Sequence, residues 1–304
     1  MKKVSIIGMG ALGLMYGTLI KKNAPEVELT YVADKNRAIK NNDTDFEVNG
    51  EVHRFCVIAA EKAKEADLLI VAVKYTGFSD ALEYMKNCIG SHTIVISVMN
   101  GISSERLIGE RYGFEHMIYS VAQGMDAMKF DNKLTYTQSG ELRIGITKSG
   151  KPENLDRLIK FFARIQLSYT LEEDILYRLW GKLMLNVGIN QTCMIYGQTY
   201  GQVLEKGESN RIFYAACREV LAVAIAEGIN LTEGDIEEYV KILGTLSYDG
   251  MPSMAQDRVN KKPSEVDLFA GTVIELGKKH DISVPTNEFL YERIKEIEKE
   301  YIVR

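Results

Sequence analysis

Short apolar runs alternate with stretches of helical periodicity in the first half of the chain. The apolar runs predict strands at residues 2–7, 27–34, 65–74, 92–101 and 116–125. Helical periods lie between several of them, at residues 11–23, 78–88 and 104–113. Strands that alternate with helical connections are typical of parallel βαβ units. Apolar and polar residues also alternate at 133–147 around Ser139 and Gly140, which predicts an antiparallel hairpin at the edge of the sheet.

The pattern changes after about residue 170, where helical periods dominate. They predict helices at residues 173–195, 208–228, 232–246, 264–280 and 286–300. Three of these stretches begin with a capping residue, namely Thr232, Ser264 and Thr286, each followed by acidic residues. We therefore place a domain boundary near residue 170, between a mixed α/β domain at 1–170 and an all-helical domain at 171–304.

Composition excludes several classes of protein. Of the 304 residues, 46% are hydrophobic and 26% are charged, as in ordinary globular proteins. The apolar runs are shorter than the ~20 residues of a membrane span, and the basic start lacks the rest of a signal peptide. The net charge of −5 comes without a dense basic stripe. We expect a cytoplasmic protein that binds neither membranes nor nucleic acid, and its acidic helical domain could support a homodimer.

The four cysteines point away from a metal centre. Cys56, Cys88, Cys193 and Cys217 are isolated in the sequence, with no CxxC pair and no histidine pair nearby. A zinc site or a disulfide framework needs closer spacing, so we expect none. We predict that all four are small buried hydrophobic side chains.

The first strand runs into the glycine motif "GMGALG" at 8–13. Its predicted cofactor-binding residues are Gly8, Gly10, Ala11, Leu12 and Gly13. GxGxxG alone is a weak signature, but here a strand precedes it and a helix follows it. The first glycine allows a tight turn, the second lets the backbone approach a pyrophosphate, and the third lets helix and strand pack closely. The helix N-terminus would then face the phosphates. The motif predicts a Rossmann-type parallel sheet domain that binds a dinucleotide.

An acidic residue follows the second predicted strand. Asp34 lies 21 residues after Gly13, where an acid hydrogen-bonds the ribose hydroxyls of NAD in such domains. The 2′-phosphate of NADP would be repelled by the same carboxylate. Lys35 and Arg37 follow at once and could offset part of that repulsion. The alternative is that Asp34 is only a turn residue at the end of a strand.

The segment "GKLMLNVGIN" at 181–190 is an apolar helix with a polar row. Lys182, Asn186 and Asn190 are spaced by four residues, so they lie along one face. A lysine partly removed from water can have its pKa lowered toward working pH and can act as a proton donor. The two carboxamides can bind a ligand without adding charge. The alternative is a lysine that reaches solvent over polar core positions.

Five segments resemble the ketopantoate reductase (2-dehydropantoate 2-reductase) family. They occur in the family's order and are spread over nearly the whole chain. They are "IIGMGALG", "VAVKYTGFSDAL" at 71–82, "SVMNGI" at 97–102, "LWGKLMLNVGIN" at 179–190 and "PSMAQDRVNKKPSEVDLFAG" at 252–271. The resemblance implies a Rossmann domain joined to an all-helical substrate-binding and catalytic domain. It also implies reduction of ketopantoate to pantoate with NADPH, on the route to pantothenate and coenzyme A.

The resemblance implies a role for individual residues. It makes Lys182 the proton donor to the substrate carbonyl. Four residues correspond to substrate-binding residues of the family, namely Asn186, Asn190, Ser253 and Glu265. Of these, Glu265 is the one that meets the substrate hydroxyl. Asn100 lies near the nicotinamide and the substrate, and Lys74 lies along the cofactor. Asp267 fits an acid that stabilises a helix N-terminus.

Asp34 departs from the family pattern, in which most members carry a basic residue at this position. The resemblance thus predicts NADP(H) as the cofactor, whereas the charge of Asp34 predicts a preference for NAD(H). Relatives on this scaffold include D-2-hydroxyacid dehydrogenases that use NADH on other branched 2-keto acids, and this is the alternative function. A nucleotide sensor without catalysis is a third possibility, but it would have no use for Lys182 and the substrate-binding residues together.

Overall fold

The computed structural model describes residues 1–301, which form two compact units. One unit comprises Met1–Asn100 and Ser104–Ile175, and the other comprises Gly101–Ser103 and the chain from Leu176 onward. Each unit has its own cluster of buried apolar side chains. The change of pattern near residue 170 thus precedes the division between the units by five residues. Within residues 1–301, no helix is both long and apolar enough to cross a membrane.

A five-stranded parallel sheet forms the centre of the first unit. The parallel sheet was predicted, but its strand Cys56–Ala59 was missed, and the predicted strand at 116–125 pairs antiparallel in another sheet. The order of the five-stranded sheet is β5-β2-β1-β6-β7. The strands are β1 (Lys3–Ile7), β2 (Glu28–Ala33), β5 (Cys56–Ala59), β6 (Leu68–Val71) and β7 (Ile94–Ser97). The chain builds outward from β1 in one direction and then restarts on its other side at β6. This reversal is the switch point of a Rossmann fold, next to which ligands bind.

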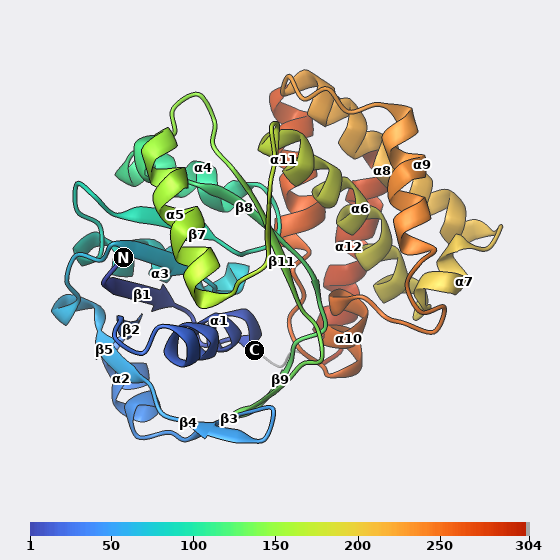
Figure 1. Cartoon of the computed structure of the whole chain (residues 1–304). Coiled ribbons are helices and arrows are strands. Elements are labelled where there is room, and N and C mark those ends of the chain that lie inside the picture. Colours follow the sequence, from blue (N-terminus) through green and yellow to red (C-terminus); the bar gives the residue numbers. More distant parts are fainter. Residues whose placement is uncertain (302–304) are drawn as a thin grey trace. The chain divides into compact units, whose positions relative to one another are not determined.

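Helices connect and cover these strands. They are α1 (Ala11–Asn23), α2 (Lys35–Asn42), α3 (Phe78–Tyr84), α4 (Ser103–Tyr112) and α5 (Pro152–Ile165), with short 3₁₀ turns η1 (Ala60–Lys62), η2 (Tyr75–Gly77), η3 (Met85–Asn87) and η4 (Phe114–His116). Helices α1 and α5 lie side by side (Figure 1), and the Asn23 amide donates to the Ile165 carbonyl at 2.8 Å. Every residue of β6 and β7 is buried, as expected for strands covered on both faces.

The predicted hairpin at 133–147 is wrong. Strand β11 (Ser139–Gly145) pairs antiparallel with β8 (Tyr119–Met125), and β12 (Tyr169–Leu171) completes that sheet. Strand β10 (Lys133–Thr135) belongs to a separate sheet with β9 (Met128–Phe130), β3 (Phe46–Val48) and β4 (Glu51–His53). Gly140 is needed for close strand approach and not for a hairpin turn, because a Cβ there would lie 2.2 Å from the Gln123 carbonyl oxygen.

The second unit is helical, as predicted. Its helices are α6 (Ile175–Tyr196), α7 (Tyr200–Leu204), α8 (Glu208–Ala226), α9 (Glu233–Leu243), α10 (Ser253–Val259), the π-helix η5 (Asp267–Gly271), α11 (Thr272–Lys279) and α12 (Pro285–Lys299). The sequence pattern missed the two short helices α7 and α10. It also predicted an ordinary helix at 264–280, whereas the first helical residues of this stretch form a π-helix.

Capping predictions had mixed outcomes. Thr232 is the N-cap of α9, where its backbone N–H donates to the Asp235 carboxylate at 2.7 Å. Thr286 is not a cap, because α12 already begins at Pro285. The Glu219 carboxylate of α8 instead accepts from the backbone N–H groups of Thr286 and Asn287, at 2.7 and 2.8 Å. A distant acid thus satisfies the helix N-terminus that a local residue was expected to cap.

Cysteine burial was predicted correctly for three of the four residues. Cys56 is exposed, because it is the first residue of the edge strand β5. Cys88, Cys193 and Cys217 are buried. Burial raises the pKa of Cys88 to about 11 and that of Cys193 to about 12, which keeps both thiols protonated at neutral pH.

Candidate active site

The glycine motif forms the turn between β1 and α1. Gly8 has a φ of +110°, and a Cβ there would lie 2.3 Å from the Ala72 carbonyl oxygen just beyond β6. A Cβ on Gly13 would lie 2.1 Å from the Gly8 carbonyl oxygen. Both positions therefore exclude a side chain on account of the protein's own backbone. Together they hold the first turn of α1 close to the ends of β1 and β6.

Gly10 differs from the other two glycines, because open space surrounds it. It is the N-cap of α1, and the nearest atom to a Cβ there would be the Ala72 carbonyl oxygen at 3.8 Å. A side chain at Gly10 would occupy the space in front of the helix N-terminus, whose first N–H groups point outward. Ala11 and Leu12 follow in the first turn and are half-buried. This cradle fits a dinucleotide pyrophosphate.

Three further predicted residues follow strands of the same sheet. Asp34 follows β2 directly, Lys74 lies three residues beyond β6, and Asn100 lies three residues beyond β7. Because these strands and β1 are parallel, all three residues and the glycine turn lie at the carboxyl edge of one sheet. Lys74 is exposed, and Asn100 is half-buried. The structure thus gathers every predicted cofactor residue at one edge.

Asp34 already has a role without any ligand. It is the N-cap of α2, and its Oδ1 accepts from the Arg37 backbone N–H at 2.9 Å. Its Oδ2 lies 3.3 Å from Arg37 Nε. Arg37 is 71% exposed, so solvent screens this ion pair and it contributes little stability. Each carboxylate oxygen has two acceptor positions, so the cap leaves Asp34 able to accept from a ribose hydroxyl.

In the second unit, the polar row on α6 is connected by hydrogen bonds. The Asn190 amide donates to Asn186 Oδ1 at 3.2 Å, and Ser253 Oγ of α10 donates to Asn190 Oδ1 at the same distance. Asn190 is only 5% exposed. Three residues predicted to bind substrate therefore touch one another, although Ser253 lies 63 positions from Asn190 along the chain. Lys182 lies one turn before Asn186 and is half-buried.

The remainder of α6 explains why the row is held firmly. A Cβ on Gly181 would lie 2.1 Å from Tyr239 Oη of α9, and one on Gly188 would lie 2.5 Å from Cys217 Sγ of α8. Seven residues separate these glycines, so they share a face that packs closely on two helices. At 100° per residue, the two asparagines point roughly opposite to that face.

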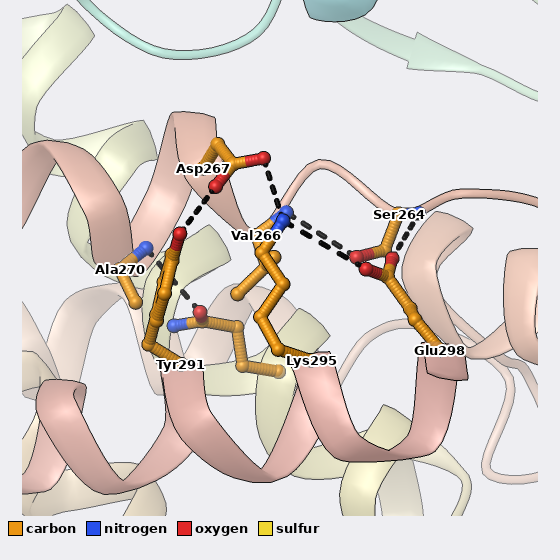
Figure 2. Close-up of polar contacts among 8 residues, drawn as sticks. Ser264, Val266, Asp267, Ala270, Tyr291, Lys295 and Glu298 are labelled. Atoms are coloured by element: carbon orange, nitrogen blue, oxygen red, sulfur yellow. Dashed lines mark hydrogen bonds and ion pairs between the residues drawn. The ribbon is translucent and has the colours of Figure 1, made fainter. Parts of the chain in front are cut away.

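Glu265 lies just before the π-helix η5 and is half-buried. Its backbone carbonyl accepts from the N–H groups of Leu268 and Phe269, at 3.0 and 3.1 Å. Figure 2 shows the side chains around this segment, which α12 supplies in large part. Asp267 is the first residue of η5, an acid at a helix N-terminus as predicted, and its carboxylate also contacts Tyr291 and Lys295. The backbone at Glu265 is thus fixed by its own carbonyl and by the contacts of Asp267.

Sequence reasoning missed Gln191, which links two parts of this site. Gln191 is fully buried on α6, where its amide donates to the Val187 carbonyl at 2.7 Å. Its Oε1 accepts from the Ala270 backbone N–H of the π-helix at 3.3 Å. A glutamine directly after Asn190 in an apolar helix was the available signal. Without knowledge of the π-helix, however, its partner Ala270 could not be identified from the sequence.

Comparison with known proteins identifies a family for the chain. Residues 4–149 match the family model "Ketopantoate reductase PanE/ApbA", and residues 174–298 match the model of that family's C-terminal part. A 2-dehydropantoate 2-reductase of Streptococcus pyogenes is 27% identical over 291 residues, which is 93% of each chain.

Solved structures show the same fold along nearly the whole chain. A PanE/ApbA family ketopantoate reductase from Ralstonia eutropha has a TM-score of 0.82 at 25% identity, over 98% of this chain and 99% of that one. A D-mandelate dehydrogenase with NADH and anilino(oxo)acetate has a TM-score of 0.86 at 21% identity, over 99% and 100%. The two family models together match most of the sequence, and the chain therefore belongs to the ketopantoate reductase family of oxidoreductases.

Proposed function

We propose that the protein reduces 2-dehydropantoate (ketopantoate) to pantoate with a nicotinamide cofactor. The observation that carries the proposal is a hydrogen-bonded chain from Asn186 through Asn190 on α6 to Ser253 of α10. Lys182 lies one helical turn before Asn186 on α6. The row combines a cation with neutral groups that can donate and accept, as a 2-keto acid requires. Curated relatives that span 93% of this chain are named for the same reaction.

The residues of this chain divide the work as follows. Gly8, Gly10 and Gly13 would hold the pyrophosphate at the start of α1, and Lys74 and Asn100 would lie along the rest of the cofactor. When bound, the nicotinamide supplies a hydride to the carbonyl carbon of the substrate. Lys182 gives a proton from its ammonium group to the carbonyl oxygen as negative charge develops there. The resulting neutral amine regains its proton from solvent.

Substrate orientation falls to the remaining residues. Ser253 and the two asparagines would hold the carboxylate and keto ends through hydrogen bonds, and Glu265 would accept from the hydroxyl of ketopantoate. A site built to bind a hydroxyl group rejects analogues that lack it, because its own polar atoms are then left without partners. Glu265 therefore determines which 2-keto acid fits best.

The alternative function is an NADH-dependent D-2-hydroxyacid dehydrogenase that acts on another branched 2-keto acid. Asp34 at the end of β2 favours it, because its carboxylate suits the ribose hydroxyls of NAD. The match to D-mandelate dehydrogenase shows that this fold also serves such a reaction in another protein.

One kinetic panel tests both functions. Ketopantoate, its deoxy analogue trimethylpyruvate and a larger aromatic 2-keto acid are each assayed with NADH and with NADPH. We expect the highest kcat/KM for ketopantoate. A higher value for either of the other two acids would support the alternative and would contradict the proposed substrate. Molar mass in solution separately tests the predicted homodimer.

A further inference from the structure

One face of α12 holds the short segment that carries Glu265 (Figure 2). Tyr291, Lys295 and Glu298 are spaced by four and three residues, so they share a face of the helix. All three contact residues between Ser264 and Asp267. The face thus meets the chain immediately before and after Glu265.

The contact before Glu265 is made by Glu298. Its carboxylate accepts from the Ser264 backbone N–H at 2.6 Å, and both residues are only 7% exposed. Ser264 Oγ in turn accepts from the Val266 backbone N–H at 3.3 Å. Hydrogen bonds to a charged group are among the strong ones, so the backbone before Glu265 is tightly held.

The contact after Glu265 is made by Asp267. Its Oδ1 accepts from Tyr291 Oη at 2.7 Å, and its Oδ2 accepts from Lys295 Nζ at 2.8 Å. Lys295 Nζ also lies 3.8 Å from Glu298 Oε2 and 5.4 Å from the centre of the Tyr291 ring. The Lys295 ammonium group therefore joins both contacts, because it is shared by the two carboxylates.

The π-helix fixes the same segment from the other direction. Gly271 N–H bonds to the Val266 carbonyl five residues earlier, at 3.0 Å. The Ala270 N–H instead reaches Gln191 on α6, the helix that carries the asparagine row. Single π-helical turns are rare and occur often at functional sites. The backbone around Glu265 is thus set relative to both α12 and α6.

We propose that Lys295 is a positioning residue that determines specificity for the substrate hydroxyl through Glu265. The inference rests on the proposed function, in which Glu265 binds that hydroxyl. The Asp267 and Glu298 carboxylates lie 2.8 and 3.8 Å from the Lys295 ammonium group, so without it two negative charges would remain there with no cation between them. The segment would then move away from the helix and carry Glu265 out of position. Lys295 is 33% exposed, so its loss opens no large cavity in the core.

The first test is Lys295→Met, measured with ketopantoate and with trimethylpyruvate, which differs from it only by the missing hydroxyl. We expect KM for ketopantoate to rise about tenfold, while kcat and the KM for trimethylpyruvate change by less than about threefold. Lys295→Arg should restore most of the loss, because it keeps the cation. Lys299→Met removes an exposed lysine from the same helix and serves as the matched control, with no change expected.

The second test combines Lys295→Met with Glu265→Gln. If Lys295 acts through Glu265, the double variant should be hardly worse on ketopantoate than Glu265→Gln alone. Equal effects of Lys295→Met in both backgrounds would overturn the positioning role and leave the proposed function intact. An unchanged KM in Glu265→Gln alone would overturn the role of Glu265, and the inference with it. If Lys295→Met does not fold, Tyr291→Phe removes one hydrogen bond of the same group and is tested for the same coupling.

Discussion

The first unit presents its candidate site through backbone and turns, whereas the second presents it through side chains on helices. Gly8 and Gly13 shape the first site by having no side chain, and the sheet edge brings the other residues near them. In the second unit, Asn190 and Ser253 meet through their side chains across two helices. A backbone site is set by the fold itself, but a side-chain site depends on each neighbour that holds a rotamer in place.

This difference has a consequence for substitutions. In the first unit, substitutions that add atoms should lower activity most, because the space proposed for the cofactor is bounded by backbone. In the second unit, substitutions that remove atoms should lower activity most, because the polar group that remains loses its hydrogen-bond partner. Substitutions of both kinds can therefore break or sharpen the comparison.

The largest effect is expected at Lys182. Lys182→Ala should lower kcat by about 10²–10⁴-fold, the usual contribution of a positioned proton donor. The KM for the cofactor should hardly change, because the residue would meet the substrate carbonyl. Steady-state kinetics with saturating cofactor measure this directly. A variant that keeps most of its kcat would show that another group donates the proton.

The next effect separates two glycines of the same turn. Gly10→Val adds atoms in open space in front of α1, so the protein should stay folded while the cofactor KM rises by roughly 10–100-fold. Gly8→Ala should instead cost about 1–3 kcal/mol of stability, because a residue with φ near +110° is strained and meets the Ala72 carbonyl. Urea unfolding and cofactor titration distinguish the two. Loss of folding in Gly10→Val would mean that the open space serves packing.

A smaller effect is expected at Glu265. Glu265→Ala should raise KM for ketopantoate by about tenfold, because a buried substrate hydroxyl loses its acceptor. The same variant should do much less to trimethylpyruvate, which has no hydroxyl to lose. Comparison of kcat/KM for the two substrates measures the difference. Equal losses on both would indicate that Glu265 holds other residues of the site and does not meet the hydroxyl.

Sequence reasoning succeeded where one local pattern determined the structure. The glycine motif and the apolar strands predicted the parallel sheet, because a buried parallel strand needs a continuous apolar run and the turn needs glycine. The row on α6 was visible because Lys182 and its two asparagines interrupt an apolar helix at a regular spacing. In each case, the information lay within about 20 residues.

Prediction from the sequence failed where a strand or side chain has its partner far away along the chain. Strand β11 pairs with β8 and not with β10, a choice made by the tertiary packing of strands that all alternate similarly. The acid that satisfies the start of α12 is Glu219, 67 residues before Thr286. The contact of Lys295 with Asp267 also joins residues far apart, 28 positions along the chain. The π-helix that begins at Asp267 was not visible as a pattern in the sequence. Side-chain sites are therefore harder to predict than backbone sites.

The smallest effect expected is at Asp34, where the two kinds of site overlap, because this side chain both caps α2 and would meet the cofactor ribose. We expect the native enzyme to prefer NADH by about tenfold or more, since a contact repulsion between the carboxylate and a 2′-phosphate is of the order of a few kcal/mol. Asp34→Asn is the sharpest variant, because asparagine is an equally good N-cap and only the charge is lost. It should reduce the preference by roughly tenfold without a change in the urea midpoint. Arg37→Met should act in the opposite direction and strengthen the preference for NADH, because Arg37 lies 3.3 Å from the carboxylate and offsets its charge. The measurement is kcat/KM for both cofactors in the native protein and in the two variants. A native enzyme that favours NADPH, with the same ratio in Asp34→Asn, would show that Asp34 is only a helix cap and that the cofactor choice is made elsewhere at the sheet edge.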